Sequence, residues 1–227
     1  IIVEVQGDVK KGASYEENFA RRSRVSEGAN AAHIGRFLSD ASGKPLSAVV
    51  VDAAKKCLVD WLGVAIAGAW ESFARAVKSY AELDDATLPI IGAAQDVENA
   101  ALVNGVAAHA LNFDDTHIPT DSHISAVTWA ALLAFAERSR VDEQNLLRAF
   151  IADYKIVTKF LSHCFGFSLQ FRRFHLCAVI GRLASSVAVT VVMVLDELEA
   201  VQAVGLSAMG PPDLRNVWRN GKSAGGR

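Results

Sequence analysis

Apolar residues recur along this chain with the three-to-four-residue spacing of amphipathic helices. The pattern predicts a first helix over about residues 27–39, which the turn sequence SGKP at residues 42–45 ends. Ser47 can then cap a longer helix over about residues 48–67, and the small residues at its end, GVAIAGA, allow neighbouring helices to approach closely. The apolar face of this second helix contains Val50, Ala54, Cys57, Leu58, Trp61 and Ala65.

The rest of the chain repeats this helical pattern. A short extended piece, TLPIIG, precedes a helix of small residues that leads into a polar loop, and SHCFGFSLQFRRFH at residues 162–175 indicates an irregular crossing. Asp142 is placed to cap a later helix. We predict an all-α, helical-bundle-like domain over residues 25–227, after an arm at residues 1–24 that forms a short strand or a loosely ordered segment. Its other helices are predicted over about residues 71–83, 124–138, 143–160, 177–195 and 197–209.

Composition agrees with one large domain and excludes several classes of protein. Of 227 residues, 51% are hydrophobic and 21% are charged, which is enough for one sizeable core. The net charge of -2 and the scattered basic residues favour no nucleic-acid partner, and no apolar run approaches the ~20 residues of a membrane span. The chain begins without a signal-peptide pattern, and its three widely spaced cysteines favour buried thiols, so we expect a cytoplasmic protein. Because it also begins without Met, we expect a processed or cut product.

The densest group of ionisable side chains lies within residues 101–126, where the small-residue helix runs into the polar loop. Carboxylates and imidazoles close together can act as acid and base, as proton abstraction beside a carboxylate and expulsion of a hydroxyl require. Two other interpretations stay open. The polar residues could solvate a turn while one histidine caps the next helix, or they could bind a metal ion through Asp114, Asp115 and either His117 or His123. The polar residues of the loop are Asn112, Asp114, Asp115, Thr116, His117, Asp121 and His123.

Two segments outside this loop could also carry chemistry. His175 precedes the most apolar helix, where it could be catalytic or a buried hydrogen-bonding residue. Arg172 and Arg173 could bind a substrate carboxylate through paired N–H donors, or form a solvated basic turn. Lys222 lies in the glycine-rich segment NGKSAGGR, whose spacing does not match a phosphate-binding loop.

Three segments together resemble the MmgE/PrpD family: VDWLGVAIAGA, which ends at Ala69, ALVNGVAAHALNFDDTH at residues 101–117, and RFH at residues 173–175 before a small-residue helix. The resemblance covers about residues 28–200. It implies a large all-α domain with a smaller α+β lid, usually in a homodimer, that acts on small polycarboxylates without a required organic cofactor. We expect no cofactor and no metal ligands. Members include 2-methylcitrate dehydratase, cis-aconitate decarboxylase and iminodisuccinate epimerase. Because the chain stops about where the lid would begin, we expect a truncated form without the lid.

The resemblance also assigns roles to residues of this chain. The family's DFDDT motif falls on residues 112–116, and its following loop histidine falls on His123. The family's histidine after Arg-Phe falls on His175, and its substrate-binding lysine falls on Lys222. By this resemblance, the catalytic residues are His123, His175, Asp115 and Thr116. The substrate-binding residues are Asn112, Asp114, Lys222 and Arg173.

The chain departs from the family pattern at two positions. Asn112 stands where the family has an acid, and an amide cannot accept a proton at neutral pH. Lys222 is followed by SAGGR, without the family's second histidine. Three hypotheses therefore remain. The first is a carbon–oxygen or carbon–carbon lyase, or an isomerase, that acts by acid–base proton transfer on a small di- or tricarboxylic acid. The second is a truncated or degenerate relative that binds a carboxylate ligand or a partner subunit without turnover. The third is a metal-dependent enzyme that uses the Asp and His residues of the loop.

Overall fold

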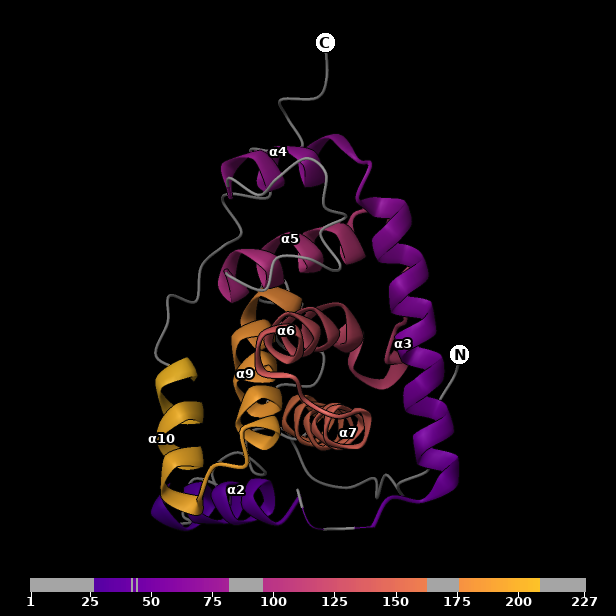
Figure 1. Ribbon diagram of the computed structural model, residues 1–227. Coiled ribbons are helices and arrows are strands. Elements are labelled where there is room, and N and C mark those ends of the chain that lie inside the picture. The colour runs from indigo at the N-terminus through magenta and orange to yellow at the C-terminus, as the bar shows by residue number, and fades with distance from the viewer. Residues whose placement is uncertain (1–26, 42, 44, 82–95, 163–175, 209–227) are drawn as a thin grey trace, which may run out of the picture.

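The computed structural model describes residues 27–41, 43, 45–81, 96–162 and 176–208, and most of these residues are helical (Figure 1). A short 3-10 helix, η1 (Ile118–Thr120), interrupts the loop between α5 and α6. Within these ranges the only β structure is an isolated antiparallel bridge between His117 and Ser122, which confirms the predicted all-α class. No helix in the described ranges is long and apolar enough to cross a membrane. The helices are α2 (Glu27–Ala41), α3 (Ala48–Gly68), α4 (Ser72–Tyr80), α5 (Val97–His109), α6 (Ile124–Ser139), α7 (Glu143–Phe160), α9 (Leu176–Val192) and α10 (Glu197–Ala208).

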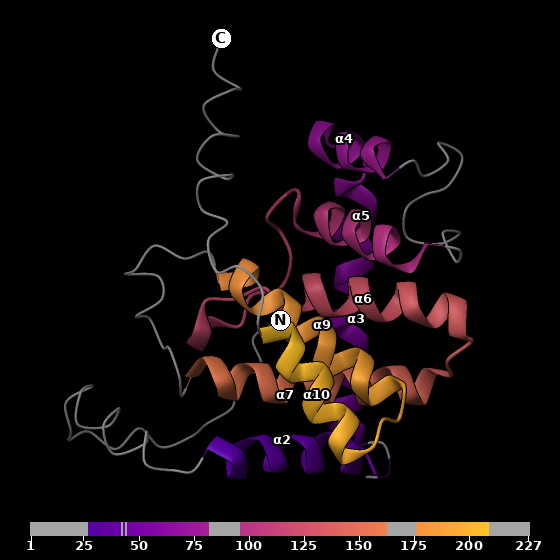
Figure 2. The ribbon, with the colours of Figure 1, turned by 90° about the vertical axis from the view of Figure 1, so that its left-hand side faces the viewer.

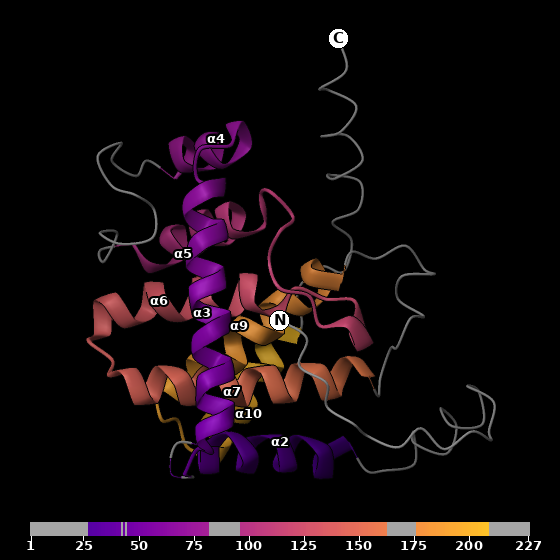
Figure 3. The same ribbon diagram turned by 90° about the vertical axis from the view of Figure 1, so that its right-hand side faces the viewer.

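The helices form a stack with a long helix along one side. Helices α5, α6 and α7 lie in successive layers, with α4 beyond α5 and α2 at the opposite end (Figure 1). Helix α3 crosses the edge of these layers and contacts α5, α6 and α7, as Figure 3 shows. Helix α9 packs against α6 and α7, and α10 packs against α9 and α2 (Figure 2). The polar loop therefore joins two adjacent layers of the core.

Two helix starts follow the expected capping chemistry, and a third does not. Asp142 accepts a hydrogen bond from the backbone N–H of Asn145 at 3.0 Å, which confirms the predicted cap of α7. Asp96 caps α5 in the same way, with the backbone N–H of Asn99 at 3.1 Å. Ser47 precedes α3 as predicted, but its side chain makes no capping hydrogen bond.

Aromatic side chains fix the position of α6. Trp129 is 0% exposed and stacks on Phe150 of α7, with 4.4 Å between the ring centroids. The indole N–H of Trp61, on α3, donates to the carbonyl oxygen of Ala126 at 3.3 Å. These contacts hold the first two turns of α6, which follow the polar loop, against both α3 and α7.

Some predicted segments lie outside the described residues. These are the N-terminal arm at residues 1–24, the extended piece TLPIIG, most of the crossing before α9 and the C-terminal tail. The division into an arm and a single domain therefore stays a prediction.

Candidate acid–base site

The polar loop runs from residue 110 to residue 123, between the end of α5 and the start of α6. Asn112 adopts a left-handed backbone with φ 55°, which asparagine tolerates better than most residues, and its side chain is exposed. Asp121 makes a second left-handed turn with φ 48° directly after η1. The loop returns on itself through the bridge between His117 and Ser122. This folding brings residues from the two ends of the loop together.

The carboxylate of Asp114 lies between two imidazoles. Its side chain is 1% exposed, and its two oxygens lie 3.0 and 3.1 Å from Nδ1 of His109, the last residue of α5. Nδ1 of His123, the residue before α6, lies 3.3 Å from the same carboxylate. The two imidazole centroids are 4.9 Å apart, with 60° between the ring planes. One buried carboxylate thus serves two histidines.

The charges of this group stabilise one another. Burial opposes ionisation of Asp114, but hydrogen bonds and charge from His109 and His123 outweigh it and lower the pKa of Asp114 to about 2. The hydrogen bond with Asp114 raises the pKa of His123, and burial of the ring opposes that shift. His123 can therefore hold a proton at a higher pH than an ordinary histidine, as a proton carrier near neutral pH requires. Thr116 is exposed, and its Oγ1 lies 3.5 Å from Nδ1 of His123, at the outer limit of a hydrogen bond.

Asp115 belongs to a second polar group, between the loop, α3 and α6. It accepts a hydrogen bond of 2.7 Å from the hydroxyl of Ser125, and the thiol of Cys57 is a further donor. Burial raises the pKa of Asp115, and the negative charges of Asp60 and Asp114 add to this effect against the two hydrogen bonds. Burial, with the charge of Asp115, also raises the pKa of the Cys57 thiol to about 12. Asp115 thus keeps its proton more readily than Asp114 does.

His117 has a structural environment. Its Nδ1 lies 2.6 Å from the hydroxyl of Thr120, which in turn lies 2.7 Å from the hydroxyl of Ser122. The ring meets Tyr154 of α7 edge-on at 5.8 Å, and burial lowers the pKa of His117. Burial thus favours the neutral form of His117, and its contact with Thr120 of η1 helps to fix the conformation of the loop.

The first turn of α9 adjoins the histidine pair. Cys177 lies in that turn, and burial raises the pKa of its thiol to about 11. A hydrogen bond with the backbone of His123 opposes this rise, and the charge of Asp114 adds to it. Figure 2 shows the start of α9 beside the loop between α5 and α6.

The structure therefore brings together three predicted site residues, Asp114, Thr116 and His123. Asp115 lies in the adjoining polar group, while Asn112 is exposed in the turn after α5. The roles of the other predicted site residues stay predictions, because those residues lie outside the described ranges. They are His175, Arg173 and Lys222.

Sequence reasoning missed His109. The residue lies in the small-residue helix, and its partner Asp114 is five positions later, beyond the helix end. No helical or strand period relates two such positions, so only the turn at residues 110–113 brings them together. The single signal in the sequence was the presence of a third histidine within a few residues of the acidic motif.

The same three side chains could hold a divalent cation. One ligand atom from each of His109, Asp114 and His123 lies within 4.8 Å of the other two, and two imidazoles with one carboxylate are a common donor set for transition metals. The metal hypothesis from the sequence had named Asp114 and His123, together with Asp115 and His117, but not His109. Asp115 is engaged with Ser125, and His117 with Thr120, so neither belongs to this group.

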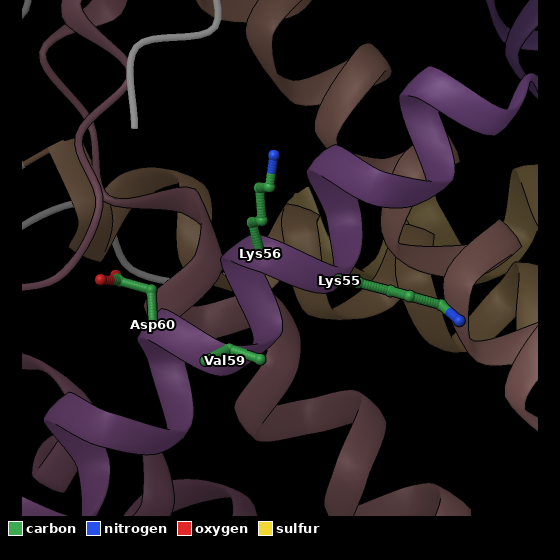
Figure 4. Close-up of a pocket in the computed structure, with 4 residues that line it drawn as sticks. All are labelled: Lys55, Lys56, Val59 and Asp60. Carbon is green, nitrogen blue, oxygen red and sulfur yellow. The ribbon is translucent and has the colours of Figure 1, made fainter.

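A surface hollow on α3 lacks the features of a binding site. It has a volume of about 330 Å³ and is lined by Lys55, Lys56, Val59 and Asp60. Figure 4 shows that the two lysines leave the helix in different directions, so their charges do not converge on one point. The histidine pair and its carboxylate remain the best-supported site among the described residues.

Comparison with known proteins gives two matches. Residues 32–225 match the model of the MmgE/PrpD N-terminal domain. The chain is also 26% identical over 167 residues to human cis-aconitate decarboxylase, and this match covers 70% of the chain. It covers 34% of the human enzyme, so the chain spans about a third of the length of that relative.

Proposed function

Because this chain belongs to the MmgE/PrpD family, we propose that it transfers protons to and from a small di- or tricarboxylic acid, as a lyase or an isomerase. The reaction is a dehydration, a decarboxylation or an epimerisation, each of which moves a proton at a carbon beside a carboxylate. The similarity to a cis-aconitate decarboxylase supports a substrate of this class. The predicted homodimer and cytoplasmic location belong to the same proposal.

The observation that carries this proposal is the contact between His123 and the buried carboxylate of Asp114, 3.3 Å apart. A buried carboxylate holds the imidazole in one orientation and stabilises its protonated form, as a general acid or base requires. His123 is therefore the residue that we assign to proton transfer.

A second candidate function is binding without turnover. Its support is Asn112, which replaces an acid of the family pattern and is turned outward in a left-handed turn. An exposed amide there cannot exchange a proton with a substrate. In that case the chain would bind a polycarboxylate and leave its carbon-bound hydrogens unchanged.

Solvent exchange separates the two functions. The protein is incubated in D₂O with 2-methylcitrate, citrate or cis-aconitate, and proton NMR follows the entry of deuterium beside a carboxylate. We expect exchange with the wild-type protein and a loss of about 10²- to 10⁴-fold for His123→Asn, because the asparagine amide keeps a donor near Asp114 but cannot carry the proton. His33→Gln, on the exposed face of α2, serves as the control.

Two outcomes would contradict the proposal. A folded wild-type protein that binds one of these acids without any exchange would favour binding alone. Full exchange by His123→Asn would show that His123 is not the proton carrier.

A further inference from the structure

We propose that His109 is the second proton carrier of this site, paired with His123, and that Asp114 fixes both imidazoles in the same tautomer. This inference rests on the proposed function and names the residues that act as its acid and its base. His109 is the last residue of α5, three positions before Asn112, whose amide cannot exchange a proton.

The argument begins with the atoms that meet at Asp114. An ionised carboxylate can only accept hydrogen bonds, and it lies within 3.0 to 3.3 Å of Nδ1 of both rings. Each Nδ1 must therefore carry a hydrogen. A ring in that tautomer gains and loses its second proton at Nε2, so both histidines exchange protons at the same ring position.

The distance between the rings then separates their roles. With centroids 4.9 Å apart, two positive rings would repel each other, and Asp114 supplies only one negative charge to offset them. One carboxylate offsets the charge of one protonated ring, so we assign one ring the role of acid and the other the role of base. The site holds one acid and one base together.

This state matches the proton balance of the proposed chemistry. In a dehydration, the neutral ring takes the proton from the carbon beside the carboxylate at its Nε2. The electron pair of that C–H bond forms the double bond, and the C–O bond breaks toward the leaving oxygen. The positive ring gives its Nε2 proton to that oxygen, which leaves as water. The pair ends with the same number of protons as it began with.

The tautomers can be measured directly. Long-range nitrogen–proton NMR spectra of histidine-labelled protein distinguish an Nδ1–H ring from an Nε2–H ring, and His109→Asn and His123→Asn assign the signals. Both rings should be Nδ1–H in the wild-type protein. In Asp114→Asn at least one ring should change, because the amide replaces one acceptor atom by a donor. An Nε2–H signal for either ring of the wild-type protein would overturn the proposal.

A pair of variants separates proton transfer from positioning. The amide nitrogen of His109→Asn stands as many bonds from the backbone as Nδ1 does, so this variant keeps the hydrogen bond to Asp114 and removes the exchanging nitrogen. We expect His109→Asn and His109→Ala to lower kcat alike, by at least about 100-fold, while KM changes much less. If His109→Asn restored kcat, the role of His109 would be positional and the proposal wrong. Should His109→Ala fail to fold, His109→Asn and the spectra still decide.

The outcome is distinguishable from a failure of the proposed function. A wild-type protein that exchanges no deuterium into any tested acid would end the proposed function, while two Nδ1–H rings would still support the pairing through Asp114. Metal analysis gives a further decisive result. A stoichiometric divalent ion in the purified protein, lost in Asp114→Asn, would overturn the inference, because a metal between these atoms requires Nδ1 without its hydrogen.

Discussion

Replacing Asp114 by asparagine should destabilise the protein by an amount that depends on pH. The pKa of this carboxyl is lowered from the ordinary 3.8 to about 2, and its side chain is 1% exposed, so solvent screens the interaction little. At about 1.4 kcal/mol for each pKa unit, ionised Asp114 contributes about 2 kcal/mol to the free energy of unfolding. The amide introduced by Asp114→Asn keeps the shape of the side chain but loses the charge that both imidazoles contact.

The sign of the pH dependence follows from the two shifts. A lowered carboxyl pKa stabilises the folded state above the ordinary value of 3.8, and this contribution is lost as the pH falls through about 2. The raised pKa of His123 stabilises the folded state below its ordinary value of 6.5, and this contribution is lost as the pH rises through the raised value. The difference between wild-type protein and Asp114→Asn should therefore be largest between about pH 4 and 6.5.

Urea denaturation followed by far-UV circular dichroism measures this difference. We expect about 2 kcal/mol at pH 5.5, about half of that at pH 3, and a smaller value at pH 8.5 than at pH 5.5. Asp121→Asn is the matched control, since it removes the same charge from an exposed position of the same loop where asparagine also tolerates the left-handed backbone. It should change the free energy by less than about 0.5 kcal/mol. A difference for Asp114→Asn that stays constant from pH 3 to 8.5 would refute the electrostatic reasoning.

Three further predictions concern packing and reactivity. Gly68→Ala should lower the free energy of unfolding by more than about 2 kcal/mol, because the new Cβ would lie 2.1 Å from the carbonyl oxygen of Ala107. Gly63→Ala should raise it by up to about 1 kcal/mol, because nothing lies within 4 Å of the new Cβ. Chemical denaturation of both variants tests this contrast. Trp129→Ala should cost about 3 to 5 kcal/mol in the same assay, since the ring is 0% exposed, and a cost below 1 kcal/mol would mean that α6 is held by other contacts. Burial raises the pKa of Cys57 to about 12, so a thiol reagent at pH 8 should not label it until urea unfolds the protein. Peptide mass mapping would show this. Labelling of the folded protein at the rate of a free thiol would contradict the burial of Cys57.

Hydrophobic periodicity predicted the bounds of some helices closely. Helix α7 was predicted over residues 143–160 with Asp142 as its cap, and the structure has Glu143–Phe160 with that capping bond, because cap and apolar face are both local. Helix α3 was predicted to end near residue 67 and ends at Gly68. The interior of the loop was different: η1 and the bridge from His117 to Ser122 follow no period, and neither was predicted.

Only part of the candidate site could likewise be predicted from the sequence. The sequence indicated that the loop carries chemistry, and the structure places Asp114, Thr116 and His123 together. The sequence also placed Asp115 with the catalytic group, a role that stays a prediction, since its described contacts include Ser125 and Cys57. Side-chain direction after a helix end depends on each backbone angle of the turn, and no spacing rule supplies those angles.

By itself, the sequence determined the helical class, most helix positions and the family resemblance, because hydrophobic spacing, caps and motifs are written along the chain. Only the tertiary structure decided that His109 and His123, fourteen positions apart, share one buried carboxylate. That contact depends on how the layers α5 and α6 stack and on two left-handed turns between them. The chemistry of the site is thus a property of helix packing, while the residues that perform it are a property of the sequence.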